Sequence, residues 1–406
     1  MERFDVQVLG AGIVGRSLAL SLARLGLRVA LRADTSQADT SRADTSRADT
    51  SQTDTSQADT SQTDTSQAEL SRAVAAPDVR AYALNAASVA LLRSLKVWDA
   101  LPAHAATPVL DMHVQGDAAP AALDFSAWQQ RVSALAWITD AAVLERELAQ
   151  AVRFAPHITV VDASAEVQAA LTALCEGKDS PARAVLGVAF DRHDYGHRAI
   201  AARLTSARAH QGMARQWFRS PDVLALLPFD TPAPDKSYAL VWSMPEARAA
   251  ELLAASDTGF EQALMQATGA EAGELTLTSA RASWPLMHAS AQAWAGPGWV
   301  LLGDAAHVVH PLAGQGLNLG LADVTALTRV IEQREAWRAL GDEKLLRRYT
   351  RERAAPTWAM GQVTDGLLNL FAEPSPAVRE LRNRGLTLVN RLSPLKRWLA
   401  GQALRA

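Results

Sequence analysis

The chain has 406 residues, 49% of them hydrophobic, and its 40 Lys and Arg residues nearly balance 43 Asp and Glu residues, for a net charge of −3. A chain of this size can bury a large core and is expected to form more than one domain, whereas its charge gives no indication of nucleic-acid binding. The single cysteine excludes an internal disulfide.

Two features bear on the location of the protein. The first predicted strand begins at residue 4, which leaves no room for a signal peptide. No apolar run approaches the roughly 18–20 residues that span a bilayer. We therefore expect a cytoplasmic protein that is not integral to a membrane.

The chain opens with a predicted strand at residues 4–9, a helix at 13–25 and a second strand at 27–31. The turn between the first two elements reads Gly10-Ala11-Gly12-Ile13-Val14-Gly15. In such a turn Gly10 permits the tight bend, Gly12 lets the backbone approach a pyrophosphate, and Gly15 lets the helix pack on the strand. The helix N-terminus adds free N–H groups and a positive dipole end, so the turn predicts a dinucleotide site.

An acidic residue about 20 positions further on normally binds the adenosine ribose. The corresponding place holds Ala33, and Asp34, one residue later, is the candidate substitute.

From Ala33 onward a five-residue unit of the type Ala-Asp-Thr-Ser-Gln repeats until an altered unit ends at Arg72. A pentapeptide-repeat β-helix is one interpretation, but its coils need a large apolar residue in each unit, where this chain has Thr. A disordered surface loop is the other, and the polar composition favours it because such a tract cannot bury enough surface to offset its ordering entropy.

The rest of the chain alternates between the two patterns. The predicted helices and strands are a helix at 84–101, a hairpin at 108–125, a helix at 141–152, a strand at 158–161, strand-rich stretches at 184–245 and 274–286, a buried strand at 299–302, and helices after residue 317.

A second motif, Gly303-Asp304-Ala305-Ala306-His307, follows the buried strand directly and continues from His310 to Gly320. A strand that ends in Gly-Asp places a carboxylate at the C-terminal edge of the sheet, where ligands of such sheets bind. That carboxylate can accept hydrogen bonds from sugar-like hydroxyls. Gly314 and Gly316 expose backbone N–H groups at the start of the next helix, where they can stabilise negative charge.

The string from Gly303 to Gly320, together with the segment Asp78-Val79-Arg80-Ala81-Tyr82-Ala83-Leu84, resembles the para-hydroxybenzoate-hydroxylase-like flavoprotein monooxygenases, and within them the ubiquinone-biosynthesis ring hydroxylases. The resemblance covers nearly the whole chain apart from residues 33–72. A further family motif, Ala-Asp-Gly-x-x-Ser-x-x-Arg, is present in altered form: Gly177, Ser180 and Arg183 match, but Glu176 replaces Asp.

The resemblance implies FAD as cofactor, NAD(P)H as reductant and O2 as co-substrate. It implies that Asp304 binds the ribityl chain, that Arg80 contacts the cofactor, and that residues 311–318 line the isoalloxazine ring. The expected cofactor-binding residues are Gly10, Gly12, Gly15, Asp34, Arg80, Gly177, Gly303, Asp304, Gly316, Leu317 and Asn318. The expected catalytic residues of the flavin-ring loop are Pro311, Gly314 and Gln315.

The predicted fold is α/β: a Rossmann-like FAD-binding domain interleaved with a β-rich substrate domain, plus C-terminal helices. We divide the chain into a first FAD-binding segment (1–107, with a low-complexity insertion at 33–72), a substrate-domain hairpin (108–133), a second FAD-binding segment (134–183), the β-rich substrate domain (184–278), a third FAD-binding segment (279–345) and a C-terminal helical region (346–406).

Several residues have two interpretations. Without the family, Arg80 reads as a solvated surface arginine. His307 and His310 are candidate acid/base groups or structural loop histidines. The stretch 214–218 is either sheet core or a pocket wall. No His, Cys and carboxylate cluster has the spacing of a metal site.

The end of the chain, from Val378 onward, has seven basic residues, a single acid, Glu380, and leucines at three- and four-residue steps. This pattern predicts a basic amphipathic helix. The helix either packs on the domain with a solvated basic face, or attaches to a partner or to the inner face of an anionic membrane.

The predicted function is hydroxylation of an aromatic ring, with a polyprenyl phenol of ubiquinone biosynthesis as the expected substrate. A flavin-dependent reductase or dehydrogenase of the same fold is one alternative. A non-catalytic scaffold of the biosynthetic assembly is the other, supported by the replaced acids at Ala33 and Glu176.

Overall fold

The N-terminal strand begins a six-stranded sheet with the strand order β16-β17-β9-β1-β2-β8. The fold is described from a computed structural model, which covers residues 3–33, 78–116, 122–309 and 315–372. β1 pairs in parallel with β2 and β9, and β9 pairs in parallel with β17. The strands of this sheet are β1 (Arg3–Leu9), β2 (Val29–Arg32), β8 (Ile158–Val161), β9 (Gln168–Leu174), β16 (Ala295–Gly296) and β17 (Trp299–Leu301).

Helices cover this sheet because its strands are apolar on both faces. α1 follows β1 directly and packs against α5 and α9. The long helix α10 packs on α9 and against β16. The helices of this half are α1 (Ile13–Arg24), α3 (Ala86–Ser94), α5 (Ala141–Arg153), α6 (Pro181–Val185), α9 (Gln315–Glu332) and α10 (Glu343–Ala372).

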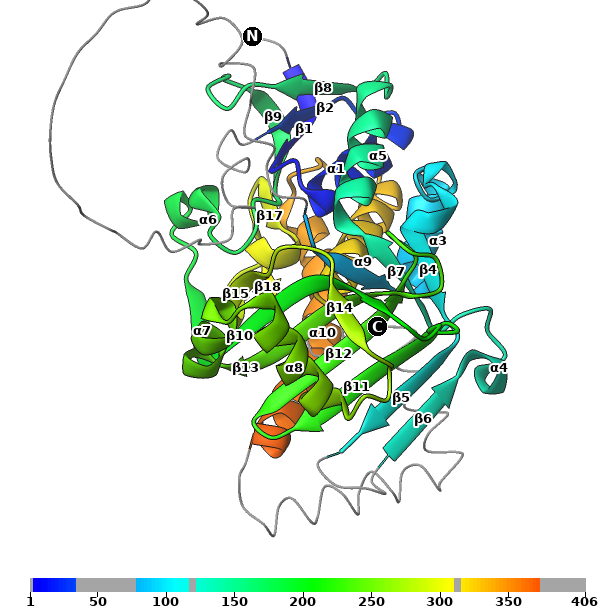
Figure 1. Ribbon diagram of the computed structural model, residues 1–406. Coiled ribbons are helices and arrows are strands. Elements are labelled where there is room, and N and C mark those ends of the chain that lie inside the picture. The colour runs from blue at the N-terminus through cyan, green and yellow to red at the C-terminus, as the bar shows by residue number, and fades with distance from the viewer. Residues whose placement is uncertain (1–2, 34–77, 117–121, 310–314, 373–406) are drawn as a thin grey trace, which may run out of the picture.

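A larger, mostly antiparallel sheet of nine strands forms the other half of the described structure (Figure 1). Along its main path the order is β18-β15-β10-β13-β12-β11-β5-β6, and β14 pairs with β10. Its strands are β5 (Asp111–Gln115), β6 (Ala122–Ser126), β10 (Phe190–Ser206), β11 (Met213–Arg219), β12 (Asp222–Phe229), β13 (Ser237–Pro245), β14 (Leu275–Leu277), β15 (Ala282–Ala291) and β18 (His307–Val308).

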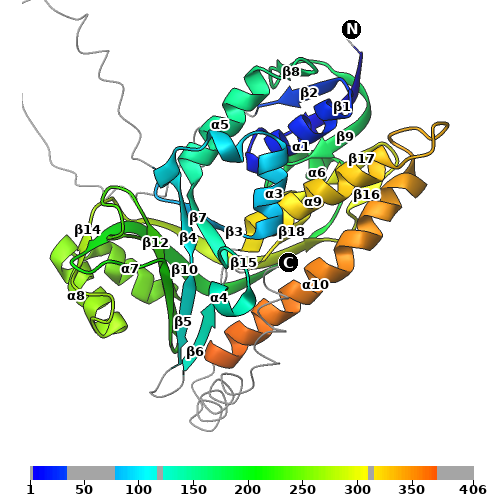
Figure 2. The ribbon, with the colours of Figure 1, turned by 90° about the vertical axis from the view of Figure 1, so that its right-hand side faces the viewer.

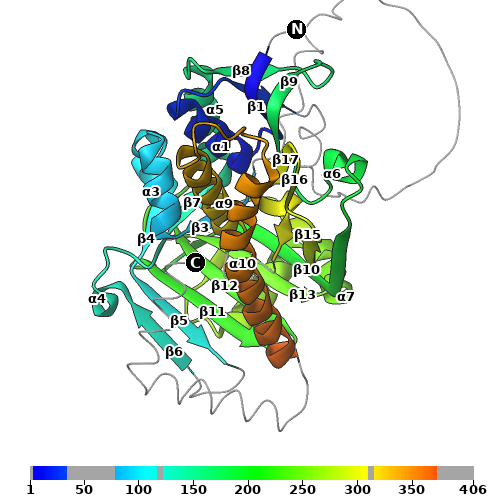
Figure 3. The same cartoon turned by 180° about the vertical axis from the view of Figure 1, so that it is seen from behind.

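The two faces of the nine-stranded sheet have different neighbours. α7 (Glu246–Ala254) and α8 (Asp257–Thr268) cover one face, and α10 crosses the opposite face, as Figures 1 and 3 show from the two sides. A small sheet with the order β3-β7-β4 packs on the same face of the nine-stranded sheet as α10, through residues such as Ile138 and Phe229. Figure 2 shows this small sheet near α9, which contacts β3. Its strands are β3 (Ala81–Leu84), β4 (Ala106–Val109) and β7 (Ala136–Asp140).

The structure confirms the predicted fold class and most of the predicted elements, but it corrects the helix expected at 84–101. Leu84 belongs to strand β3, and the helix there is α3, followed by a short 3-10 turn (Trp98–Ala100). Asn85 separates the two elements because its side chain accepts a hydrogen bond from the Ser88 N–H at 2.8 Å and caps α3. Helices α7 and α8 were not among the predicted elements.

The remaining short elements are α4 (Ala127–Gln130) and two further 3-10 turns, Ala103–Ala105 and Gly303–Ala305. Both interpretations of the five-residue repeat, and both interpretations of the basic tail, concern residues outside those described. Among the described helices, none has the length and apolar character needed to cross a bilayer.

Candidate functional site

The glycine turn after β1 has the geometry that a dinucleotide site requires. Gly10 has a φ of +96°, and a Cβ there would overlap the carbonyl of Cys175; a Cβ on Gly15 would overlap the carbonyl oxygen of Gly10. Both positions therefore need glycine for the fold itself. Gly12 differs, because a Cβ there would point into open space.

No side chain caps the N-terminus of α1, where Gly12 is the N-cap residue. The first N–H groups of the helix are thus left to a ligand, and the open space beside Gly12 gives that ligand access to the backbone. These two observations fit a pyrophosphate.

Asp304 stands in the turn after β17 and combines two properties of a ligand-binding carboxylate. Its side chain is exposed to solvent, yet the surrounding protein desolvates it strongly enough to raise its pKa above the ordinary value, against the opposing charges of His307 and Lys178. An accessible group that is crowded in this way can accept hydrogen bonds from ligand hydroxyls. Gly303, with a φ of +58°, lies close to Val14 of α1, so the two motifs meet.

A buried network fixes this turn in place. Asp323 of α9 is fully buried and accepts hydrogen bonds from the Gly303 N–H at 3.0 Å and from His307 Nε2 at 2.7 Å. Its other oxygen accepts from Arg353 Nε of α10 at 2.7 Å. Although burial alone would raise the pKa of Asp323, the charges of His307 and Arg353 lower it. The carboxylate therefore joins the turn, α9 and α10 as an ion, and this geometry favours the structural interpretation of His307.

Arg80 lies in a cluster of charges rather than on a solvated surface. Its guanidinium donates to Asp78 at 2.6 Å and to Glu145 at 3.2 Å. Burial raises the pKa of the neighbouring Tyr82 to about 12, and Asp304 is among the charges that act on it. The structure thus brings Arg80 and Asp304, which are more than 200 residues apart in sequence, to one region.

The altered motif after β9 supports the same turn. Arg183 donates to the carbonyl of Ala305 at 2.8 Å and to that of Lys178 at 2.7 Å. Glu176 accepts hydrogen bonds from Ser180 Oγ and from the Ala182 N–H. Gly177 has a φ of +81°, in the left-handed region that favours glycine. This loop is therefore organised around its own glutamate and is tied to the Asp304 turn by Arg183.

At the start of α9, Gln315, Gly316, Leu317 and Asn318 occupy different environments. A Cβ on Gly316 would meet open space, and Leu317 packs against the main core. Asn318 is buried, with its side chain donating to the carbonyl of Ala83 at 2.8 Å and accepting from the Asn85 N–H at 3.0 Å.

Asn318 therefore anchors α9 to β3, and Gly316 leaves its backbone accessible. Of the other expected site residues, Asp34, Pro311 and Gly314 lie outside the described residues, as does His310. The residues that the sequence reasoning missed are Asp323 and Arg353; a buried acid within the apolar face of α9 was the available signal.

Two other features of the described structure lie apart from these residues. His210, Asp230 and Asp235 come together at a distance compatible with a metal ion, which their spacing in the sequence did not predict. His210 Nδ1, however, accepts a hydrogen bond from the Gly212 N–H at 3.0 Å, so Nε2 carries the proton and faces the carbonyl of Phe229 at 3.2 Å. This arrangement leaves no lone pair of His210 for a metal.

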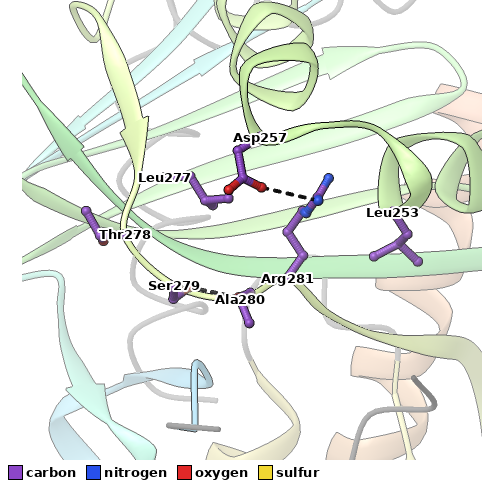
Figure 4. A pocket seen from close by; sticks show the side chains of 7 residues that line it. All are labelled: Leu253, Asp257, Leu277, Thr278, Ser279, Ala280 and Arg281. Atoms are coloured by element: carbon purple, nitrogen blue, oxygen red, sulfur yellow. Dashed lines mark hydrogen bonds and ion pairs between the residues drawn. The ribbon is translucent and has the colours of Figure 1, made fainter. Parts of the chain in front are cut away.

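The second feature is a cavity of about 540 Å³ beside α7 and α8 (Figure 4). Arg281 lines it, donating to the carbonyl of Leu252 at 2.7 Å and to Asp257 at 3.3 Å. The cavity lies on the face of the nine-stranded sheet that α7 and α8 cover, and none of the expected site residues lines it.

Comparison with known proteins agrees with this geometry. Residues 149–364 match the model of the FAD binding domain family. The chain is 28% identical to 3-demethoxyubiquinol 3-hydroxylase of Escherichia coli over 98% of each chain, and 26% identical to a ubiquinone hydroxylase of Rhodospirillum rubrum over 98% of this chain and 89% of the relative.

Two solved structures share the fold at low identity. p-Nitrophenol 4-monooxygenase of Pseudomonas putida has a TM-score of 0.72 at 16% identity, covering 100% of this chain and 99% of the other. An HpxO variant of Klebsiella pneumoniae complexed with FAD has a TM-score of 0.68 at 14% identity, covering 99% of each chain. Since the family model spans more than half of the 406 residues and the glycine turns and Asp304 fit a dinucleotide, the chain belongs to the FAD binding domain family.

Proposed function

We propose that this protein is an FAD-dependent monooxygenase that hydroxylates the aromatic ring of a ubiquinone precursor, with NAD(P)H as reductant and O2 as co-substrate. The observation that carries the proposal is the similarity to 3-demethoxyubiquinol 3-hydroxylase, which extends over 98% of both chains. The open backbone at Gly12 and the accessible, crowded carboxylate of Asp304 support it, because both are suited to hold the cofactor.

Bound FAD supplies the redox and oxygen chemistry. The residues of the chain bind and orient it. The N-terminus of α1, which is accessible beside Gly12, would bind the pyrophosphate, and Asp304 would accept hydrogen bonds from the ribityl hydroxyls. Arg80, held by Asp78 and Glu145, would contact the cofactor. The accessible backbone at Gly316 offers N–H groups at the N-terminus of α9 to negative charge on the ring.

The interleaved domain division belongs to the proposal. The strands of the six-stranded sheet fall within the three FAD-binding segments. The nine-stranded sheet falls mostly within the substrate-domain hairpin and the β-rich substrate domain, but its strands β15 and β18 fall within the third FAD-binding segment. The boundaries at residues 107, 133, 183, 278 and 345 remain predictions, which limited proteolysis of the FAD-loaded protein can examine.

The test is an assay of the purified, FAD-loaded protein with NAD(P)H, a prenylated phenol and 18O2. The proposal expects one labelled oxygen in the product ring, detected by mass spectrometry. Oxidation of NAD(P)H and reduction of an acceptor without incorporation of oxygen would favour a reductase. A protein that binds no FAD at high micromolar concentration would favour the scaffold.

The proposal also includes attachment to a membrane, because a prenylated substrate resides in a bilayer. The support is in the sequence: the segment after Val378 carries seven basic residues and one acid. Each basic residue near an anionic surface contributes about 1 kcal/mol, screened by salt.

We expect the protein to co-sediment with anionic vesicles at low salt and less at high salt. Truncation before Val378 weakens this binding while FAD stays bound. Equal binding of the truncated and full-length proteins would show that the tail is a packed helix instead, and binding by neither would point to substrate delivery by a protein partner.

A further inference from the structure

The two faces of β11 carry side chains of different kinds. Trp217 belongs to the core that the nine-stranded sheet forms with α7 and α8. Its neighbour Phe218, and Ala214 four residues before Phe218, belong to the clusters on the other face. Because side chains alternate along a strand, Gln216 lies on the same face as Ala214 and Phe218.

Across this face, Gln216 begins a row of small apolar residues. The strand registers pair Gln216 with Ala225, Ala225 with Val241, and Val241 with Ala201. We call these four residues the central row. Ala225 and Val241 keep partial exposure although they stand on the inner strands β12 and β13. The elements packed on this face therefore leave the central row partly uncovered.

The central row faces the candidate FAD site. Arg203, two residues from Ala201 on β10, donates to the backbone carbonyl of Arg80 at 2.9 Å and to Asp140 at 3.2 Å. At the sheet edge, β15 pairs with β18, which follows the Asp304 turn. α10 crosses this same face (Figure 3).

Gln216 is the polar member of the central row and is 7% exposed. Within the described residues its amide has no hydrogen-bond partner, in contrast to the buried amide of Asn318, whose oxygen and nitrogen are both engaged. Neither amide atom is among the fully enclosed atoms without a partner, which include the Ser243 hydroxyl, so the amide keeps access to the space beside the row. Gln216 therefore offers a free donor and a free acceptor beside a partly uncovered apolar row.

We propose that Gln216 is a specificity-determining residue that binds an oxygen on the aromatic ring of the substrate, while Ala225 and Val241 contact its carbon edge. This inference rests on the proposed function and adds the residue that recognises the phenol. A phenolic hydroxyl matches the amide because it can both donate to the carbonyl oxygen and accept from the NH2 group.

The experiment compares 2-geranylphenol with geranylbenzene, which lacks only the hydroxyl, as ligands of the FAD-loaded full-length protein. Affinity is read from the change in flavin absorbance. Wild-type protein is expected to bind the phenol more tightly. Gln216→Leu should weaken binding of the phenol about tenfold, the effect of losing one hydrogen bond to a buried group, and leave that of geranylbenzene unchanged. A loss of packing alone would weaken both ligands.

Ser243→Ala is the matched control, because Ser243 lies on the same face and its hydroxyl is also unpartnered, but that hydroxyl is fully enclosed. It should leave the preference for the phenol intact. Gln216→Met, which keeps length without branching, is a second variant if Leu prevents folding. Retention of the wild-type preference in either folded Gln216 variant overturns the assignment and leaves the proposed function standing. Wild-type protein that binds neither compound overturns both.

Discussion

Replacing Asp323 by Asn tests whether the buried network fixes the turn after β17, which contains Asp304. All three groups around this carboxylate are donors: the Gly303 N–H, His307 Nε2 and Arg353 Nε. An amide must point its own NH2 group at one of them, and it leaves the Arg353 charge uncompensated. Breaking a buried ion pair from one side costs about 3–5 kcal/mol. For a chain of this size, that cost corresponds to a fall in melting temperature of roughly 4–6 °C.

The control is Arg329→Met, which breaks an ion pair with Glu352 between the same two helices. That pair is solvent-exposed, with side-chain exposures of 49% and 38%, and should contribute less than about 1 kcal/mol. Melting is followed by circular dichroism and FAD affinity by titration. A similar shift in both variants would refute the reasoning that burial makes the Asp323 pair important.

The pH dependence provides a second check on Asp323. Its folded pKa lies below the ordinary value, so its contribution to stability is present above about pH 4 and is lost as the pH falls through the folded pKa. Asn cannot titrate. The difference in stability between wild type and Asp323→Asn should therefore narrow below about pH 4, and a constant difference would contradict the assignment of an ionised carboxylate.

Three further predictions concern the glycine turn, Asp304 and the five-residue repeat. Gly12→Ala should fold normally and lose FAD affinity, because its Cβ enters open space, whereas Gly15→Ala should destabilise the apoprotein itself; equal melting temperatures of the two apoproteins would count against this contrast. Asp304→Ala should lower FAD affinity by about 1.5–3 kcal/mol. It should also stabilise the apoprotein at neutral pH. The pKa of Asp304 is raised in the folded protein, so ionisation of this carboxylate lowers the free energy of unfolding as the pH rises, and Ala removes that effect. Unchanged titration and melting curves would refute its role. Deleting residues 35–67 with a short Gly/Ser link should leave a cooperative melt, and its loss would support an ordered repeat.

The sequence predicted the elements whose local signals are strong. The strand and helix around Gly10–Gly15 appear within a few residues of their expected bounds, and the strand expected at 158–161 matches β8. The prediction of a helix at 84–101 was wrong at its start, because the spacing of Leu84 and the leucines after it was given more weight than the N-cap signal. Asn85 is a strong N-cap residue, and β3 exists because it pairs with β7, more than 50 residues away.

The candidate site also combines residues that have a local sequence signal with residues that have none. Glycine turns and a Gly-Asp strand end are local patterns, so Gly12 and Asp304 could be proposed as cofactor-site residues from the sequence. The partners that fix them are not local: Asp323 and Arg353 stand on separate helices, 30 residues apart, and meet only in the packed structure. Gln216 could be placed in a strand, but which face it occupies depends on the register of β11 with its neighbours.

The single cysteine of the chain packs against the glycine turn that follows β1. Cys175 is buried, its N–H donates to the carbonyl of Leu9 at 2.7 Å, and burial raises the pKa of its thiol. The unmodified protein therefore contains one native thiol for labelling, next to the turn that would hold the cofactor. Because the thiol is buried, a thiol reagent can reach it only when the structure around it opens, so the rate of labelling, with and without FAD, measures how often this part of the protein opens.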